Sequence, residues 1–117
     1  MPTKQTFWEV RLSDAAKADL QNIINWTADH FGDRQAETYS EIVYDALEAL
    51  EDGPDVVGVR VHDDLPKGIL TLHAARSGKK ARHVILFRAE PPRSGKIIQV
   101  LRIPHDSMDL FRHVGQD

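Results

Sequence analysis

The sequence predicts an α+β fold in which a helical hairpin near the N-terminus packs on a twisted, mainly antiparallel sheet. Three observations predict this fold. A short alternating segment opens the chain, two adjoining segments with helical periodicity follow it, and several β-branched segments separated by turn residues occupy the second half. The expected order of elements is therefore β-α-α-β-β-β, followed by a short C-terminal helix.

The first two expected elements are a strand and a helix. Residues 6–12 alternate, and the set Trp8, Val10 and Leu12 is expected to turn inward. Ser13 is expected to cap a helix of about residues 14–31, because a serine oxygen accepts a free N–H of the first helical turn. Gly32 tolerates the backbone that ends a helix. The expected apolar face consists of Ala16, Leu20, Ile23, Ile24, Thr27 and Phe31.

A second helix is expected to begin immediately, with Asp33 as its cap and Gly53-Pro54 as its end. Because one or two residues separate the helices, we expect them to be antiparallel. The expected outer side carries the acids Glu37, Glu41, Asp45 and Glu48. The expected apolar face carries Ala36, Tyr39, Val43, Ala46, Leu47 and Leu50.

The second half of the sequence indicates a sheet. Residues 54–68 are rich in Gly, Pro and Asp, which favours an irregular crossover containing one extended piece. Residues 69–73, 82–89 and 96–103 are predicted to form a three-stranded meander. Asp106 is expected to cap a final short helix that carries Met108, Leu110, Phe111 and Val114, and a disordered tail is expected from Gly115 onward.

Length and composition indicate one folded domain, residues 1–117. The sequence is 41% hydrophobic and 28% charged, whereas disordered chains are poor in apolar residues. No apolar run approaches the roughly 18 to 20 residues that cross a bilayer, and residues 1–5 lack the apolar segment of a signal peptide. A cytoplasmic location without membrane contact is therefore expected.

Charge is distributed unevenly along the chain. Residues 1–59 contain four Lys or Arg against twelve Asp or Glu, whereas residues 60–117 contain eleven against six. Between Arg76 and Arg102 there are eight basic residues and one acid, Glu90. Such a basic region favours an acidic partner, either nucleic acid or an acidic protein segment. The alternative is a solvated strand surface.

Several classes of chemistry lack their usual residues. Cysteine is absent, and the six histidines show no compact ligand spacing, so neither a metal nor another cofactor is expected. Neither a Gly-x-Ser-x-Gly turn nor a phosphate-binding Gly-rich loop is found. A metal-free ribonuclease stays possible, because RNA cleavage by its own 2′-hydroxyl needs an acid, a base and cations. Its residues would be Arg82, Arg88, Arg102 and His105, unless His105 only packs at a strand end and the arginines are surface charge.

Ordered matches along the chain resemble ParE-type toxins of the RelE/ParE superfamily. Residues 10–23 are similar to the family's opening, in which a strand enters a helix through Leu-Ser-x-x-Ala-x-x-Asp-Leu. Phe31-Gly32, Gln35-Ala36 and Tyr39 resemble the second helix, with Leu47 and Leu50 before Gly53-Pro54 at its end. Residues 98–109 are similar to the closing Val-x-Arg-Ile-x-His-x-x-Met-Asp.

This resemblance implies the toxin of a type II toxin-antitoxin pair, neutralised by a ParD-like antitoxin that alone contacts operator DNA. ParE-like toxins are associated with DNA gyrase, whereas RelE-like relatives cleave messenger RNA and usually carry a tyrosine near the C-terminus. Here the tyrosines are Tyr39 and Tyr44. Three readings therefore stay open: a gyrase inhibitor, a ribonuclease, and an inactive toxin that only binds its antitoxin as a co-repressor.

For antitoxin binding we expect the groove between hairpin and sheet. Basic strand residues there could pair with acids of the antitoxin, and aromatic residues of the hairpin could line the groove. The predicted residues are Arg76, Arg82, Arg88, Arg102, Trp26 and Tyr39.

Overall fold

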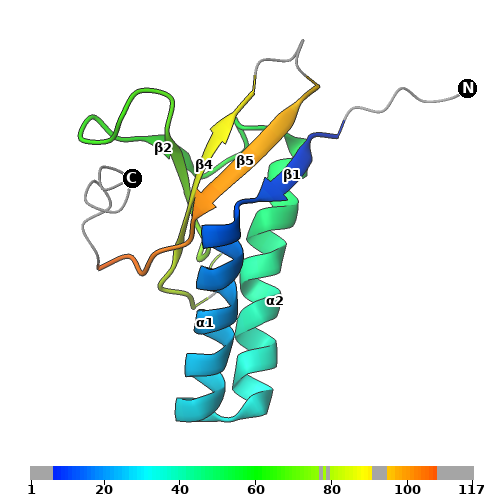
Figure 1. Cartoon of the computed structure of the whole chain (residues 1–117), viewed down its shortest axis with the longest axis vertical. Helices are drawn as coiled ribbons and strands as arrows, with labels where there is room; N and C mark the ends of the chain where they lie inside the picture. Colours follow the sequence, from blue (N-terminus) through cyan, green and yellow to red (C-terminus); the bar gives the residue numbers. More distant parts are fainter. Residues whose placement is uncertain (1–6, 77, 79, 91–94, 108–117) are drawn as a thin grey trace, which may run out of the picture.

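The protein consists of a long helical hairpin beside a five-stranded sheet, as the computed structural model in Figure 1 shows. The structure describes residues 7–76, 78, 80–90 and 95–107. The predicted α+β class and the order of elements are confirmed, and the extended piece of the crossover is strand β2. In chain order the elements are β1 (Glu9–Leu12), α1 (Asp14–Phe31), α2 (Asp33–Ala49), the 3₁₀ turn η1 (Leu50–Asp52), β2 (Val59–Val61), β3 (Leu70–His73), β4 (Val84–Ala89) and β5 (Ile97–Arg102).

The sheet has the order β1-β5-β4-β3-β2. Strands β3, β4 and β5 form the predicted antiparallel meander, and β2 extends it antiparallel to β3. Strand β1 pairs with β5 in parallel, which makes the sheet mixed. Ser13 fixes the turn between β1 and α1, because its side chain accepts the N–H of Ala16 (3.0 Å) and donates to the carbonyl of Leu101 (2.8 Å). The predicted cap is confirmed.

The turn of the hairpin is as short as predicted. Gly32, with a φ of +94°, is both the C-cap of α1 and the N-cap of α2, so one residue separates the helices. The prediction that Asp33 caps α2 was wrong, because Asp33 lies inside the first turn, where its charge still complements the helix dipole. Phe31 was predicted to lie on the apolar face of α1, but the sheet does not cover it. It is 64% exposed, because the distal end of the hairpin extends beyond the sheet (Figure 1).

The main core lies between the hairpin and one face of the sheet. Leu20, Val43 and Leu47 of the helices pack there with Phe87 and Val100 of the strands, all at most 6% exposed. The opposite face of the sheet is only partly covered. The segment between β2 and β3 places Leu65 and Ile69 against Val84 and Leu86 in a smaller cluster. The helices therefore cover one face of the sheet, except where the hairpin diverges from the strands.

The chain beyond β5 turns at Asp106 and Ser107. The predicted final helix, with Met108, Leu110, Phe111 and Val114, and the predicted disordered tail lie outside the described residues.

Candidate protein-binding groove

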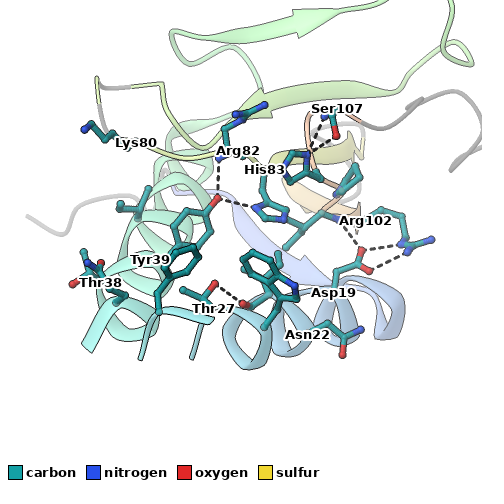
Figure 2. Close-up of a pocket in the computed structure, with 18 residues that line it drawn as sticks. Asp19, Asn22, Thr27, Thr38, Tyr39, Lys80, Arg82, His83, Arg102 and Ser107 are labelled. Carbon is teal, nitrogen blue, oxygen red and sulfur yellow. Dashed lines mark hydrogen bonds and ion pairs between the residues drawn. The ribbon is translucent and has the colours of Figure 1, made fainter. Parts of the chain in front are cut away.

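A groove of about 1070 Å³ separates the helical hairpin from the end of the sheet. Helices α1 and α2 form one wall, and the segments before β4 and after β5 form the other. Figure 2 shows how Tyr39 reaches from α2 across to His83, while Asp19 of α1 meets Arg102 at the end of β5. The groove is therefore formed by segments that are far apart in the sequence.

Exposed aromatic side chains line the helical wall. Trp26 is 55% exposed and Phe31 is 64% exposed, and both line the groove with the apolar Ile42. The Trp26 indole stacks on His30 at 4.0 Å between ring centroids and meets Phe31 edge-on at 5.8 Å. Large rigid aromatics that stay accessible on a folded protein are frequent anchors of protein interfaces.

The sheet side of the groove is basic. Among the described lining residues, Lys80, Arg82 and Arg102 carry positive charge and Asp19 carries negative charge. Arg102 donates two hydrogen bonds to the Asp19 carboxylate (2.8 and 3.0 Å), which also accepts the N–H of Ile103 (2.8 Å). Because this pair is largely buried, it fixes α1 against β5. Arg82 is 67% exposed at the rim.

Tyr39 organises the interior of the groove. Its hydroxyl oxygen accepts the backbone N–H of Arg82 (2.8 Å) and lies 2.7 Å from Nδ1 of His83. Burial raises the pKa of Tyr39, so the phenol keeps its proton. Burial, assisted by the nearby His105, lowers the pKa of His83 from 6.5 to about 4, so this imidazole is neutral at pH 7.

A second imidazole faces the first. His105 forms an isolated antiparallel bridge with His83, and the two rings meet edge-on at 5.2 Å between centroids. Nδ1 of His105 accepts the backbone N–H of Ser107 (3.1 Å) and lies 2.8 Å from the Ser107 hydroxyl.

Asp106 anchors the segment that carries His105. Its carboxylate accepts hydrogen bonds from His73 Nε2 (2.9 Å) and from Arg82 Nε (3.2 Å). The bond from His73 and then that from Arg82 hold the pKa of Asp106 below its ordinary range. These bonds connect the segment after β5 to β3 and to the segment before β4.

Comparison with known proteins identifies the family. The sequence profile described as the ParE toxin of the type II toxin-antitoxin system parDE matches residues 10–110, which include every element described above except the first residue of β1. The chain belongs to the ParE toxin family. This agrees with the resemblance noted in its sequence motifs.

Similar proteins support the same assignment. The chain is 27% identical over 105 residues to Toxin ParE1 of Caulobacter vibrioides, an alignment that covers 90% of this chain and 96% of the relative. A solved structure of the chromosomal ParDE toxin-antitoxin system from P. aeruginosa matches with a TM-score of 0.68, 21% identity and coverage of 86% and 97% of the two chains. The toxin-antitoxin complex RelBE2 from Mycobacterium tuberculosis matches with a TM-score of 0.52, 16% identity and coverage of 85% and 98%. At these identities the structures show a shared fold.

Five residues predicted as candidates line the groove of this ParE-family toxin: Trp26, Tyr39, Arg82, Arg102 and His105. The other two candidates lie elsewhere. Arg76 donates a long hydrogen bond to the carbonyl of Val57 (3.4 Å), and Arg88 is exposed on β4. Because Phe87 faces the hairpin, the next residue along the strand, Arg88, points to the opposite sheet face.

Sequence reasoning missed several residues of the groove in this toxin, among them Phe31, His83 and Asp19. His83 precedes by two positions Ile85, whose side chain packs against the hairpin, so strand alternation could have placed it on that face. Asp19 was part of the quoted helix motif, but nothing in the sequence indicated that it would bind Arg102, 83 residues later. Within the described ranges no helix is long and apolar enough to cross a membrane.

Proposed function

We propose that this ParE-family toxin is neutralised by a ParD-like antitoxin that occupies the groove, and that the free toxin inhibits DNA gyrase by binding it. The observation that carries the antitoxin proposal is the combination of an exposed aromatic wall, Trp26 and Phe31, with a basic rim opposite it. An extended or helical segment with apolar and acidic side chains complements both walls.

The solved structures support an antitoxin as the partner. Both similar structures belong to toxin-antitoxin pairs, the ParDE system in one and the RelBE2 complex in the other. The excess of three cations over one carboxylate among the described lining residues favours an acidic segment. The antitoxin, and not the toxin, is proposed to contact operator DNA.

The internal contacts of the groove favour protein binding over RNA cleavage. Arg82, Arg102 and His105 line the groove, but Asp19 holds Arg102 and Arg88 lies on the opposite sheet face, so the four predicted ribonuclease residues do not form one set. The Tyr39 hydroxyl is occupied by Arg82 and His83. We therefore favour gyrase, the target associated with ParE-like toxins, over messenger RNA.

Co-purification with the product of the adjacent reading frame tests the antitoxin proposal, provided that this product begins with a ribbon-helix-helix sequence. Lys80→Glu is expected to weaken the complex by at least about 10-fold, because a cation that lines the groove becomes an acid. The matched variant Arg88→Glu, on the other sheet face, is expected to leave affinity unchanged. Equal effects of the two reversals would contradict the proposed groove. Arg82→Glu and Arg102→Glu are unsuitable, because each would place two carboxylates together, the first at Asp106 and the second at Asp19.

A supercoiling assay with purified gyrase tests the proposed target, run beside a translation-coupled mRNA cleavage assay. Inhibition of supercoiling without cleavage is the expected result. Cleavage that His105→Ala abolishes would instead indicate the ribonuclease. Inactivity in both assays together with unaffected cell growth would indicate a co-repressor that has lost toxicity.

A further inference from the structure

The hydrogen bonds around His83 fix which of its ring nitrogens carries the proton. The Tyr39 oxygen accepts the N–H of Arg82. If it also accepted an N–H from His83, its own hydrogen would have no acceptor among the described residues, so we assign that hydrogen to Nδ1 of His83. Nδ1 is then an acceptor, and the proton of the neutral ring resides on Nε2.

The same reasoning applies to His105. A backbone N–H can only donate, so the contact with the Ser107 amide makes Nδ1 of His105 an acceptor. The proton of neutral His105 therefore also resides on Nε2. Two facing imidazoles thus present N–H donors, each held in its tautomer by a neighbouring residue.

Both Nε2 atoms are accessible. Neither has a hydrogen-bond partner among the described residues, and no buried side-chain nitrogen or oxygen in that part of the chain lacks one. Two unpartnered donors on partly buried side chains must therefore reach solvent, and both residues line the groove. With ring centroids 5.2 Å apart, the two Nε2 atoms are at most about 7.5 Å apart, and one carboxylate can span that distance with a bond of about 2.8 Å at each oxygen.

We propose that His83 and His105 form a carboxylate-binding subsite in the groove, which takes an Asp or Glu side chain of the antitoxin. This inference rests on the proposed function, in which the antitoxin occupies the groove. The three cations Lys80, Arg82 and Arg102 outnumber the two carboxylates beside them, Asp19 and Asp106, which favours an anionic acceptor over a neutral carbonyl. Because both Nδ1 atoms are occupied and both Nε2 atoms are protonated, neither ring offers a free base nitrogen, and the pair is suited to recognition.

Imidazole NMR of the free toxin tests the subsite without any antitoxin. Long-range ¹H–¹⁵N spectra are expected to show the Nε2–H tautomer for both His83 and His105 at pH 7. Acetate at constant pH and ionic strength is expected to shift both Nε2 signals saturably, whereas neutral acetamide is not. An Nδ1–H tautomer at either histidine, or equal responses to acetate and acetamide, would overturn the subsite.

Matched variants test the subsite in the complex. Asparagine places an acceptor near the former Nδ1 but has no group at Nε2, whereas glutamine retains an N–H near Nε2. His83→Asn and His105→Asn are therefore expected to weaken antitoxin binding by about 10- to 100-fold, and the glutamine variants by less than about 3-fold. Melting temperatures report whether each variant is folded.

The two proposals fail in different ways. If Trp26→Ala weakens the complex but both asparagine variants bind normally, the subsite is overturned and the groove remains the antitoxin site. If Trp26→Ala has no effect on the complex, the groove proposal fails, and the acetate titration alone then decides whether the free toxin has the subsite.

Discussion

Acid is expected to destabilise this toxin through His83. Its pKa is lowered from 6.5 to about 4, mainly by burial and then by His105, so the unfolded chain binds a proton between these values that the folded protein excludes. The stabilisation that neutral His83 contributes is therefore fully present above pH 6.5 and is lost as the pH falls toward 4. A shift of this size corresponds to about 3 kcal/mol at pH 4. Because solvent in the groove screens the partly exposed ring, we expect 1 to 2 kcal/mol, roughly half of that value.

Urea unfolding of the wild type and of His83→Asn, measured from pH 7 to pH 4, isolates this contribution. The variant cannot titrate at position 83, and it keeps an acceptor for the Tyr39 hydroxyl, so the other titrating groups largely cancel in the difference. The stability advantage of the wild type over the variant is expected to shrink by about 1 to 2 kcal/mol across this range. A pH-independent difference would refute the lowered pKa and, with it, the assignment of His83 as a neutral, partly buried imidazole.

The contacts in the groove predict the effects of substitutions at three positions. Tyr39→Phe leaves Nδ1 of His83 and a backbone N–H without their partner, so the free energy of unfolding should fall by about 1 to 3 kcal/mol in urea titrations, and an unchanged value would argue against these bonds. Asp19→Ala removes the partner of Arg102 and should cost about 3 kcal/mol, whereas Asp19→Asn, which keeps an acceptor, should cost less. Trp26→Ala should change stability by less than about 1 kcal/mol but weaken antitoxin binding by at least about 10-fold in calorimetry, and loss of stability instead would assign Trp26 to the core.

Local patterns predicted most of the fold. The alternation of Trp8, Val10 and Leu12, the cap at Ser13 and the helical periodicity of both helices depend on neighbours within a few residues, and the structure confirms them. The parallel pairing of β1 with β5 joins residues almost 90 positions apart, such as Leu12 and Val100. Periodicity does not encode such pairing, so the mixed sheet could not be predicted. Phe31 follows the helical pattern but lies beyond the sheet, where no strand covers it.

The candidate site was predictable in its elements but not in its contacts. Aromatic and basic residues on the hairpin and strands indicated a groove, and five of the predicted residues line it. The roles of His83 and Asp19 depend on tertiary contacts with Tyr39 and Arg102, which lie 44 and 83 residues away. Arg88 was included because it is basic, although its strand register directs it to the opposite sheet face. Charge counts along a sequence do not distinguish the two faces of a strand.

Hydroxyl-radical footprinting of the toxin with and without its antitoxin tests the central proposal most directly, because it reports which exposed side chains the partner covers. Trp26 and Phe31, more than half exposed in the free toxin, are expected to be strongly protected in the complex. Val57 and Val61, exposed near β2 and away from the groove, are expected to react equally in both states. Protection of the two valines with unchanged reactivity of Trp26 and Phe31 would contradict the assignment of the groove to the antitoxin.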